Sequence, residues 1–168
     1  GESIATVTGS AIDILGAERI VLNFLSYLSG IATCTHKVVE TLEGSTITVL
    51  DTRKTLPAYR KLAKYAVACG GGFNHRFNLA SMVMIKDNHI ARAGGIQEAM
   101  HHFTDFETGR KVEQPIEVEI DSLTQLEEAL FYAPDVVLLD NMKVSELKEA
   151  VQMVNRYNKH TGNRVYTE

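Results

Sequence analysis

The sequence is short of several residues that mark special classes of protein. Its 168 residues include no tryptophan and only two cysteines, Cys34 and Cys69. Two cysteines so far apart predict neither a disulfide framework nor a metal knuckle, so we expect free, mostly buried thiols in a reducing compartment. No apolar run approaches the ~18 residues that span a bilayer, and residues 1–4 lack the layout of a signal peptide. These absences favour a cytoplasmic protein without a membrane partner.

Strong charge of either sign is also lacking. The formal net charge is −4, and the hydrophobic (45%) and charged (23%) fractions are those of an ordinary globular domain. A weakly acidic chain has no general affinity for nucleic acid, so we expect no nucleic-acid partner. Any attraction for anions has to be local. The length fits one domain with a substantial core.

What the sequence does have is an alternation of strand-like and helix-like apolar patterns. The expected strands are 46–50, 82–85, 116–121, 136–139 and the beginning of one at 164–168, with a strand or hairpin arm in 1–13. The expected helices are 15–29, 33–42, 57–69, 96–103, 123–130 and 144–157, with a break at Ser29-Gly30, an N-cap at Ser122 and a polar loop at 104–114.

This order predicts an α/β fold with a parallel sheet, because most of the strands are apolar throughout. Polar residues follow one strand after another, at the end that carries the active site in such folds. Glu117 and Glu119 lie within their strand, which favours a barrel with a polar interior over an open sheet. The strands are too few to close an eight-stranded barrel, so we expect an incomplete parallel β/α barrel in a truncated chain.

Five potential cations lie beside strand ends or the glycine run at 70–72: Arg53, Lys54, His75, Arg76 and Lys86. One such residue is usually a solvated surface charge, but three such placements favour a site for a small, multiply anionic substrate. The glycine run has two readings, close backbone approach to a ligand or a helix C-cap before a turn. It matches neither a Walker loop nor a dinucleotide fingerprint.

A set of carboxylates lies further along the chain, at Glu117, Glu119, Asp121 and Asp140. They fit a solvated strand face, ion pairs with the cations, or a Mg²⁺ site completed by substrate phosphates. No spacing among His89, His101 and His102 indicates zinc, so we expect these side chains to be structural or exposed. From the helical pattern alone, we expect Arg19 to be a solvated surface charge. The residues thus indicate a cationic half-site and an acidic half-site.

The motifs together resemble the quinolinate phosphoribosyltransferase family. The matching stretches are Glu18-Arg19, Leu22-Asn23, 28–33, 51–55 with Pro57, 70–72, Asn74-His75-Arg76, 85–89, 117–119 and 138–141. They run in the family's order from about residue 15 to 141. The resemblance implies transfer of phosphoribose from phosphoribosyl pyrophosphate to quinolinate with decarboxylation, for NAD biosynthesis. It also implies a pentosyltransferase that uses Mg²⁺ and is a homodimer or higher oligomer.

The resemblance also implies roles for single residues. Arg53, His75, Arg76 and Lys86 would bind the two carboxylates of quinolinate, with Lys54 beside them. Glu119 and Asp140 would bind the ribose and the Mg²⁺-diphosphate, which makes them the expected metal ligands. The expected catalytic residues are Lys54, Lys86, Glu119 and Asp140. Arg19 would reach the neighbouring subunit's site.

The family has an N-terminal α/β sandwich domain, of which residues 1–14 would be the remnant. Residues 15–44 would be connecting helices, and residues 45–168 a partial β/α barrel that carries the active site. We expect the chain to be the central piece of a longer enzyme and to bind poorly or be inactive alone. It departs from the family at Ala58-Tyr59, where Gly-Leu is usual, a change we expect to be tolerated.

Three other readings remain open. A paralogue linked to molybdenum transport shares parts of the pattern, although the Arg-Lys and Asn-His-Arg stretches favour the quinolinate enzyme. A Schiff-base lyase would use Lys86 as its nucleophile. The third reading is an anion-binding scaffold without catalysis.

Overall fold

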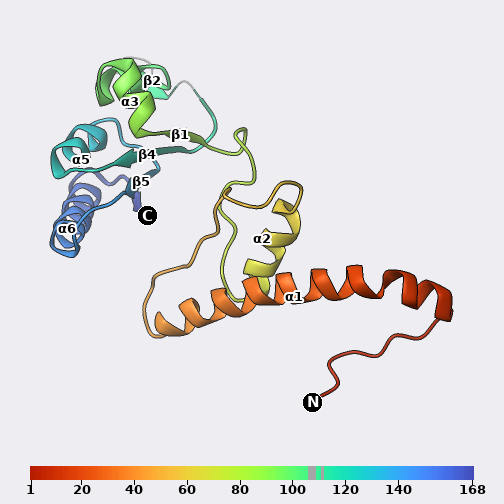
Figure 1. Cartoon of the computed structure of the whole chain (residues 1–168). Coiled ribbons are helices and arrows are strands. Elements are labelled where there is room, and N and C mark those ends of the chain that lie inside the picture. The colour runs from red at the N-terminus through yellow and green to blue at the C-terminus, as the bar shows by residue number, and fades with distance from the viewer. Residues whose placement is uncertain (106–108, 111) are drawn as a thin grey trace. The chain divides into compact units, whose positions relative to one another are not determined.

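The computed structural model runs from Gly1 to Glu168 and describes all residues except 106–108 and 111. The chain forms two compact units, residues 1–77 and 78–168, which are described separately here (Figure 1). Elements keep the labels of Figure 1.

The first unit is built on one long helix, α1 (Ala11–Thr41). The predicted break at Ser29-Gly30 is wrong, because the helix runs through both residues without interruption. A glycine in a helix interior costs only about 1 kcal/mol, which the apolar spacing on both sides of Gly30 outweighs. The predicted strand or hairpin arm in 1–13 is also wrong. Residues 1–10 form no regular element, and the helix begins at Ala11.

None of the residues of α1 is buried in this chain. Large apolar side chains are exposed along it, among them Ile12 at 83% and Leu15 at 70%. The helix is long and apolar enough to cross a membrane, which corrects the prediction that no segment reaches that length. A core helix of a soluble protein meets the same criterion, so length and composition do not decide its surroundings.

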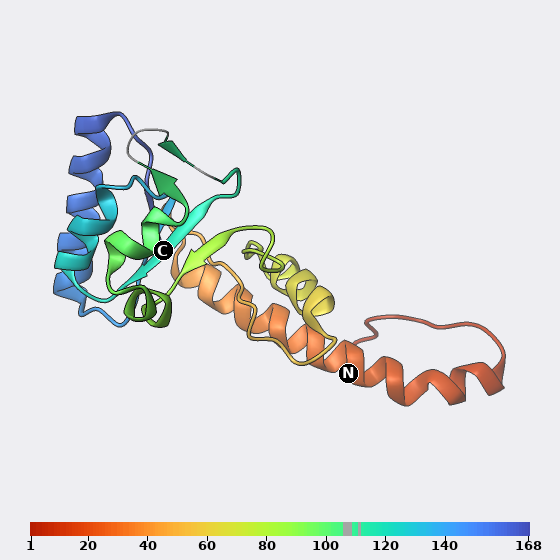
Figure 2. The same ribbon diagram turned by 90° about the horizontal axis from the view of Figure 1, so that it is seen from above.

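Helix α2 (Arg60–Cys69) packs against α1, as Figures 1 and 2 both show. The Tyr59 ring stacks on Phe24 at 5.5 Å between centroids and meets Tyr27 edge-on. The helix begins three residues later than predicted, after a left-handed Ala58 (φ 64°). The predicted strand 46–50 reduces to a single parallel bridge between Leu50 and Phe73. Both cysteines are exposed, so the prediction of buried thiols is wrong.

The second unit confirms the parallel α/β prediction. Its sheet has the order β1 (Val83–Ile85), β4 (Ile116–Ile120), β5 (Val136–Leu139) and β6 (Tyr166–Thr167), and every pair is parallel. In the described residues these four strands form an open sheet. A separate antiparallel pair, β2 (Thr104–Asp105) and β3 (Gly109–Arg110), lies within the predicted polar loop 104–114. Parts of that loop fall outside the described residues.

Four helices accompany the sheet: α3 (Asp87–Ala93), α4 (Ile96–His101), α5 (Leu123–Leu130) and α6 (Val144–Thr161). Their apolar side chains form one core with Ile85, Val118 and Val137 of the strands. Figures 1 and 2 both place α5 and α6 on the same side of the sheet. The sequence did not predict helix α3, because the polar run Lys86 to His89 directly follows an apolar strand. Ser122 caps α5 as predicted, and its hydroxyl accepts from the Gln125 N–H.

The alternation of the strands sets a polar face opposite these helices. Ile85, Val118 and Val137 point into the helical core, so their neighbours Met84, Glu117 and Val136 point to the other face. Glu119 follows at the next position on that face. The carboxylates of β4 therefore lie on the face away from the helices.

Candidate active site

Two loops carry the cations of the first unit, and the fold brings their backbones together. The Asp51 N–H donates to the Phe73 carbonyl at 3.0 Å, and the Phe73 N–H donates to the Val49 carbonyl at 2.8 Å. The pair Arg53-Lys54 and the pair His75-Arg76 thus leave from adjacent, parallel chain segments. This juxtaposition within the unit is what the sequence predicted.

The Asp51 carboxylate joins the two loops to each other and to α2. Its Oδ1 accepts from the Lys64 ammonium and, at 2.9 Å, from the His75 backbone N–H. Its Oδ2 accepts from the Asn74 amide at 2.7 Å, with the amide oriented to satisfy its neighbours. The ammonium of Lys64 also donates to the His75 carbonyl at 2.9 Å. Both polar backbone groups of His75 are therefore fixed by one ion pair.

That ion pair is buried. The side chains of Lys64 and Asp51 are each 5% exposed. Taking one charge out of water is costly unless an opposite charge and further hydrogen bonds accompany it, and both conditions hold here. The Asp of the Arg-Lys stretch and the Asn of the Asn-His-Arg stretch are therefore structural, and they hold together the two loops that carry the cations.

Arg60, one helical turn before Lys64, makes a second bridge between the loops. Its guanidinium donates to the Phe77 carbonyl at 3.2 Å and, more weakly, to the Arg53 carbonyl at 3.5 Å. Residues four apart lie on the same face of a helix, so Arg60 and Lys64 meet the loops together. Sequence reasoning missed both residues. No spacing distinguishes Lys64 from the exposed Lys61 until α2 is placed against the loops.

The acidic half lies on the second unit, at the carboxyl ends of β1, β4 and β5. The Lys86 ammonium is 3.4 Å from a carboxylate oxygen of Glu119, and both side chains remain partly exposed at 39% and 15%. The Lys86 N–H donates to Nδ1 of His89 at 3.1 Å, so His89 fixes the end of β1 and serves a structural role, as predicted.

Asp140 follows β5 directly, with its N–H bonded to the Ile120 carbonyl at 2.9 Å. Glu119 is paired in register with Leu138, so Asp140 lies two residues beyond that pair and on the same face. The carboxylate is exposed, and the turn passes through Asn141 in the left-handed region (φ 54°), which asparagine tolerates well. Two further carboxylates share this face, since ligand oxygens of Glu117 and Glu168 lie within 4.8 Å of each other.

The fold thus groups Arg53, Lys54, His75 and Arg76 on one unit, and Lys86, Glu119 and Asp140 on the other. Arg19 is exposed on α1.

The glycine run at 70–72 lies where α2 packs against α1. A Cβ at Gly70 would lie 2.4 Å from the Ala32 carbonyl oxygen, and one at Gly72 would lie 2.7 Å from Val67 Cγ1. Gly71 has φ +89°, a conformation that side chains rarely adopt. The run ends α2 and lets it pack closely on α1, which supports the C-cap reading of the sequence.

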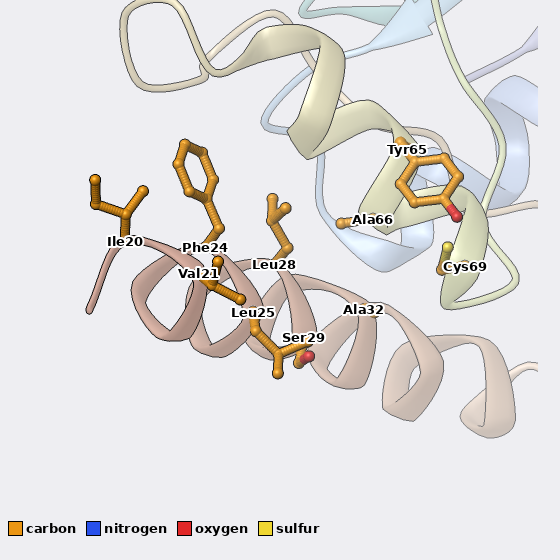
Figure 3. A pocket seen from close by; sticks show the side chains of 10 residues that line it. All are labelled: Ile20, Val21, Phe24, Leu25, Leu28, Ser29, Ala32, Tyr65, Ala66 and Cys69. Carbon is orange, nitrogen blue, oxygen red and sulfur yellow. The ribbon is translucent and has the colours of Figure 1, made fainter. Parts of the chain in front are cut away.

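A groove of about 470 Å³ runs between α1 and α2 and is almost entirely apolar (Figure 3). Figure 3 shows Phe24, Leu28 and Tyr65 extending into the space between the two helices. A hydrogen bond with Cys69 raises the pKa of the Tyr65 hydroxyl above its ordinary value, and the other lining side chains carry no charge. The groove therefore lacks the charges that a polyanionic substrate needs.

Comparison with known proteins gives one consistent family. The profile described as "Quinolinate phosphoribosyl transferase, C-terminal domain" matches residues 31–168. The nicotinate-nucleotide pyrophosphorylase (carboxylating) of Mycobacterium leprae is 43% identical over 152 residues, 90% of this chain and 52% of that protein. The probable enzyme of the same name from Bacillus subtilis is 49% identical over 141 residues, 84% of this chain and 48% of that protein.

Solved structures agree. The crystal structure of NadC from Streptococcus pyogenes has a TM-score of 0.80 and 36% identity, and the match covers 95% of this chain and 61% of that one. The nicotinate-nucleotide pyrophosphorylase of Ehrlichia chaffeensis has a TM-score of 0.80 and 38% identity, covering 94% and 62%. The chain spans about half the length of the curated relatives it matches.

Proposed function

The chain belongs to the quinolinate phosphoribosyltransferase family, and on that premise we propose a reaction for the protein at the length of its relatives. The protein transfers phosphoribose from phosphoribosyl pyrophosphate to quinolinate and releases pyrophosphate and carbon dioxide, which gives nicotinate mononucleotide for NAD biosynthesis. The observation that carries the proposal is the pairing of the two cation-bearing loops through Leu50 and Phe73. That pairing presents several cations from one small region, as a dicarboxylate requires.

Quinolinate binds to the cationic half. Arg53 and Arg76 suit its carboxylates because a planar guanidinium donates two parallel hydrogen bonds to one carboxylate. His75 and Lys54 extend the same surface, and the family resemblance assigns Lys86 to the same substrate. Contacts to both carboxylates fix the orientation of quinolinate and therefore the direction of its ring nitrogen. This orientation lowers the entropy cost of the attack of the nitrogen on the ribosyl carbon.

Phosphoribosyl pyrophosphate binds to the acidic half, where Glu119 and Asp140 face the ribose. Two carboxylates with hard oxygen donors fit Mg²⁺, which proteins usually bind through one or two carboxylates together with substrate phosphates. Asp140 is exposed and Glu119 keeps part of its surface open, so both can take part. Bound there with the diphosphate, Mg²⁺ would offset the charge of the leaving group.

The reaction needs no protein nucleophile. As the bond from the ribosyl carbon to the diphosphate oxygen breaks, positive charge develops on that carbon, and Glu119 and Asp140 have the sign to stabilise it. The pyridine nitrogen then forms the new bond with its lone pair. The ring nitrogen is now positive, and loss of the neighbouring carboxylate as carbon dioxide leaves an electron pair on the adjacent ring carbon. Lys54 and Lys86 stabilise that carbanion until it takes a proton.

The wider architecture follows from the same proposal. Glu117 and Glu119 lie on the face of the sheet opposite the helices, which suits the interior of an incomplete barrel preceded by a sandwich domain. α1 exposes large apolar residues beside Arg19. A homodimer that buries this helix would carry Arg19 to the neighbouring site.

The Schiff-base alternative has a specific observation against it. Lys86 is ion-paired with Glu119, and an amine held as an ammonium is a poor nucleophile. Trapping of a carbonyl substrate on Lys86 by borohydride would support the lyase and contradict the transferase.

The decisive test uses the protein at the length of its relatives. Incubation with quinolinate, phosphoribosyl pyrophosphate and Mg²⁺ is expected to produce nicotinate mononucleotide and carbon dioxide in equal amounts. Binding of both substrates without product would overturn the proposal.

A further inference from the structure

The cationic half-site has a carboxylate at its centre. Asp51 precedes Arg53 by two residues and accepts from the backbone N–H of His75, so it lies beside both loops that carry these cations. A buried carboxylate without a partner would attract the nearest cationic side chain, because charges interact strongly where water is excluded. Asp51 would then compete with quinolinate for the residues that bind it.

Lys64 removes that competition. Among the described residues Asp51 accepts from the Lys64 ammonium, the His75 backbone N–H and the Asn74 amide. None of these groups is the charged side chain of Arg53 or Arg76. Both oxygens of the carboxylate thus have hydrogen-bond donors other than the proposed quinolinate-binding side chains. The side chains of Asp51 and Lys64 are each only 5% exposed.

We propose that Lys64 is a positioning residue of the quinolinate half-site, an inference that rests on the proposed function. Lys64 neutralises Asp51, so this carboxylate does not compete with the dicarboxylate substrate for the neighbouring cations. It also fixes the His75 carbonyl, which sets the direction in which this loop presents its side chains. Arg60 supports the same arrangement through the carbonyls of Arg53 and Phe77.

The proposal predicts opposite effects for the two halves of the ion pair. Lys64→Met leaves a buried negative charge that draws on the substrate-binding cations, so quinolinate affinity falls. Asp51→Asn keeps a side-chain oxygen that can accept from the His75 N–H and leaves Lys64 as an extra positive charge, so quinolinate affinity does not fall. A purely structural ion pair would instead weaken binding in both variants, because each leaves one buried charge unpaired.

The experiment measures dissociation constants for quinolinate and for phosphoribosyl pyrophosphate separately, in the protein at the length of its relatives. We expect Lys64→Met to weaken quinolinate binding by about tenfold or more, equivalent to one strong charge interaction, and to leave phosphoribosyl pyrophosphate binding nearly unchanged. The double variant D51N/K64M is expected to recover most of the quinolinate affinity. Equal losses in both single variants, or equal losses for both substrates, would overturn the inference.

Two controls keep the result interpretable. Ala66→Gly weakens the same helix without removing a charge, and it should leave both dissociation constants near those of the parent. If K64M does not fold, quinolinate dissociation constants are compared for D51N and D51N/K64M instead. Both variants lack the Asp51 carboxylate, and they differ only in the charge of Lys64. Both are expected to bind quinolinate nearly as tightly as the parent or more tightly, because neither leaves a charged Asp51 without its counter-ion, and a tenfold loss in either variant would overturn the inference.

The proposed function and this inference fail in different ways. A parent protein that binds both substrates and forms no nicotinate mononucleotide contradicts the function. An active parent in which K64M and D51N behave alike contradicts only the role of Lys64.

Discussion

Gly70 lies so close to Ala32 that no larger residue fits between their helices. A Cβ built on Gly70 would lie 2.4 Å from the carbonyl oxygen of Ala32 and 2.7 Å from Cβ of Thr35. Both neighbours belong to α1, whose own hydrogen bonds limit how far they can move. The contact sets how α2 meets α1, and α2 in turn holds the two loops that carry the cations.

Gly70→Ala is therefore expected to destabilise the first unit by about 2–3 kcal/mol through overpacking. Gly30 offers a matched control, since a Cβ there meets nothing within 4 Å and the residue lies inside α1. Gly30→Ala should stabilise by roughly 0.5–1 kcal/mol, because alanine is the better helix former. Urea midpoints of the two variants measure the difference. Equal midpoints would contradict the close packing at Gly70.

Ala58 provides a second stability test, because it has φ 64° in the turn before α2. A left-handed conformation costs a residue with a Cβ roughly 1–2 kcal/mol, and glycine avoids that cost. Ala58→Gly is expected to raise the free energy of unfolding by about 1 kcal/mol. Ala68→Gly, at an exposed position inside α2, should lower it by a similar amount. A loss of stability in both variants would mean that Ala58 is not strained.

Ala58 also shows how sequence and structure complement each other. The resemblance places glycine at this position in the family, and the sequence alone gave no reason for that preference. The positive φ supplies the reason, because the turn between Pro57 and α2 requires a left-handed residue. The substitution is expected to be tolerated at a measurable cost.

The four strands of the parallel sheet and helices α4, α5 and α6 were predictable because each has a strong local pattern, whereas α3 and the β2–β3 pair were not. The β4 alternation, the apolar β5 run and the Ser122 cap all depend on neighbours within a few residues. The buried pair of Asp51 and Lys64 was not predictable, since it depends on how α2 meets two loops. The sequence predicts two helices in place of α1 because Gly30 has a low helix propensity, although the apolar pattern continues past it.

Arg76 tests the division into two half-sites. Arg76→Ala removes a guanidinium from the cationic half and is expected to weaken quinolinate binding by about tenfold to a hundredfold. Binding of phosphoribosyl pyrophosphate should change far less. Arg156→Ala, at an exposed position on α6, is the matched control for loss of an arginine. Similar losses for both substrates would argue against separate half-sites.

Glu119 tests the electrostatic role of the acidic half. Glu119→Gln removes a negative charge from beside the ribosyl carbon and is expected to lower kcat by about a hundredfold. Quinolinate should bind as tightly as before or more tightly, because the variant releases Lys86 from its ion pair. Asp140→Asn is expected to lower kcat in the same way, and Glu149→Gln on the exposed side of α6 controls for charge loss. An unchanged kcat in both site variants would remove these carboxylates from the mechanism.

Arg19 tests whether the sites are shared between subunits. Arg19→Ala and Lys86→Ala should each be nearly inactive, but a hybrid dimer of the two has one site with neither lesion if Arg19 acts on its neighbour. Random mixing makes half of the dimers hybrids, so about a quarter of the parent activity should return. Lys86→Ala mixed with Arg76→Ala is the control, because each hybrid site then keeps one lesion. Activity in the first mixture and none in the second would establish that Arg19 is contributed across the dimer, and no recovery in either would leave Arg19 without that role.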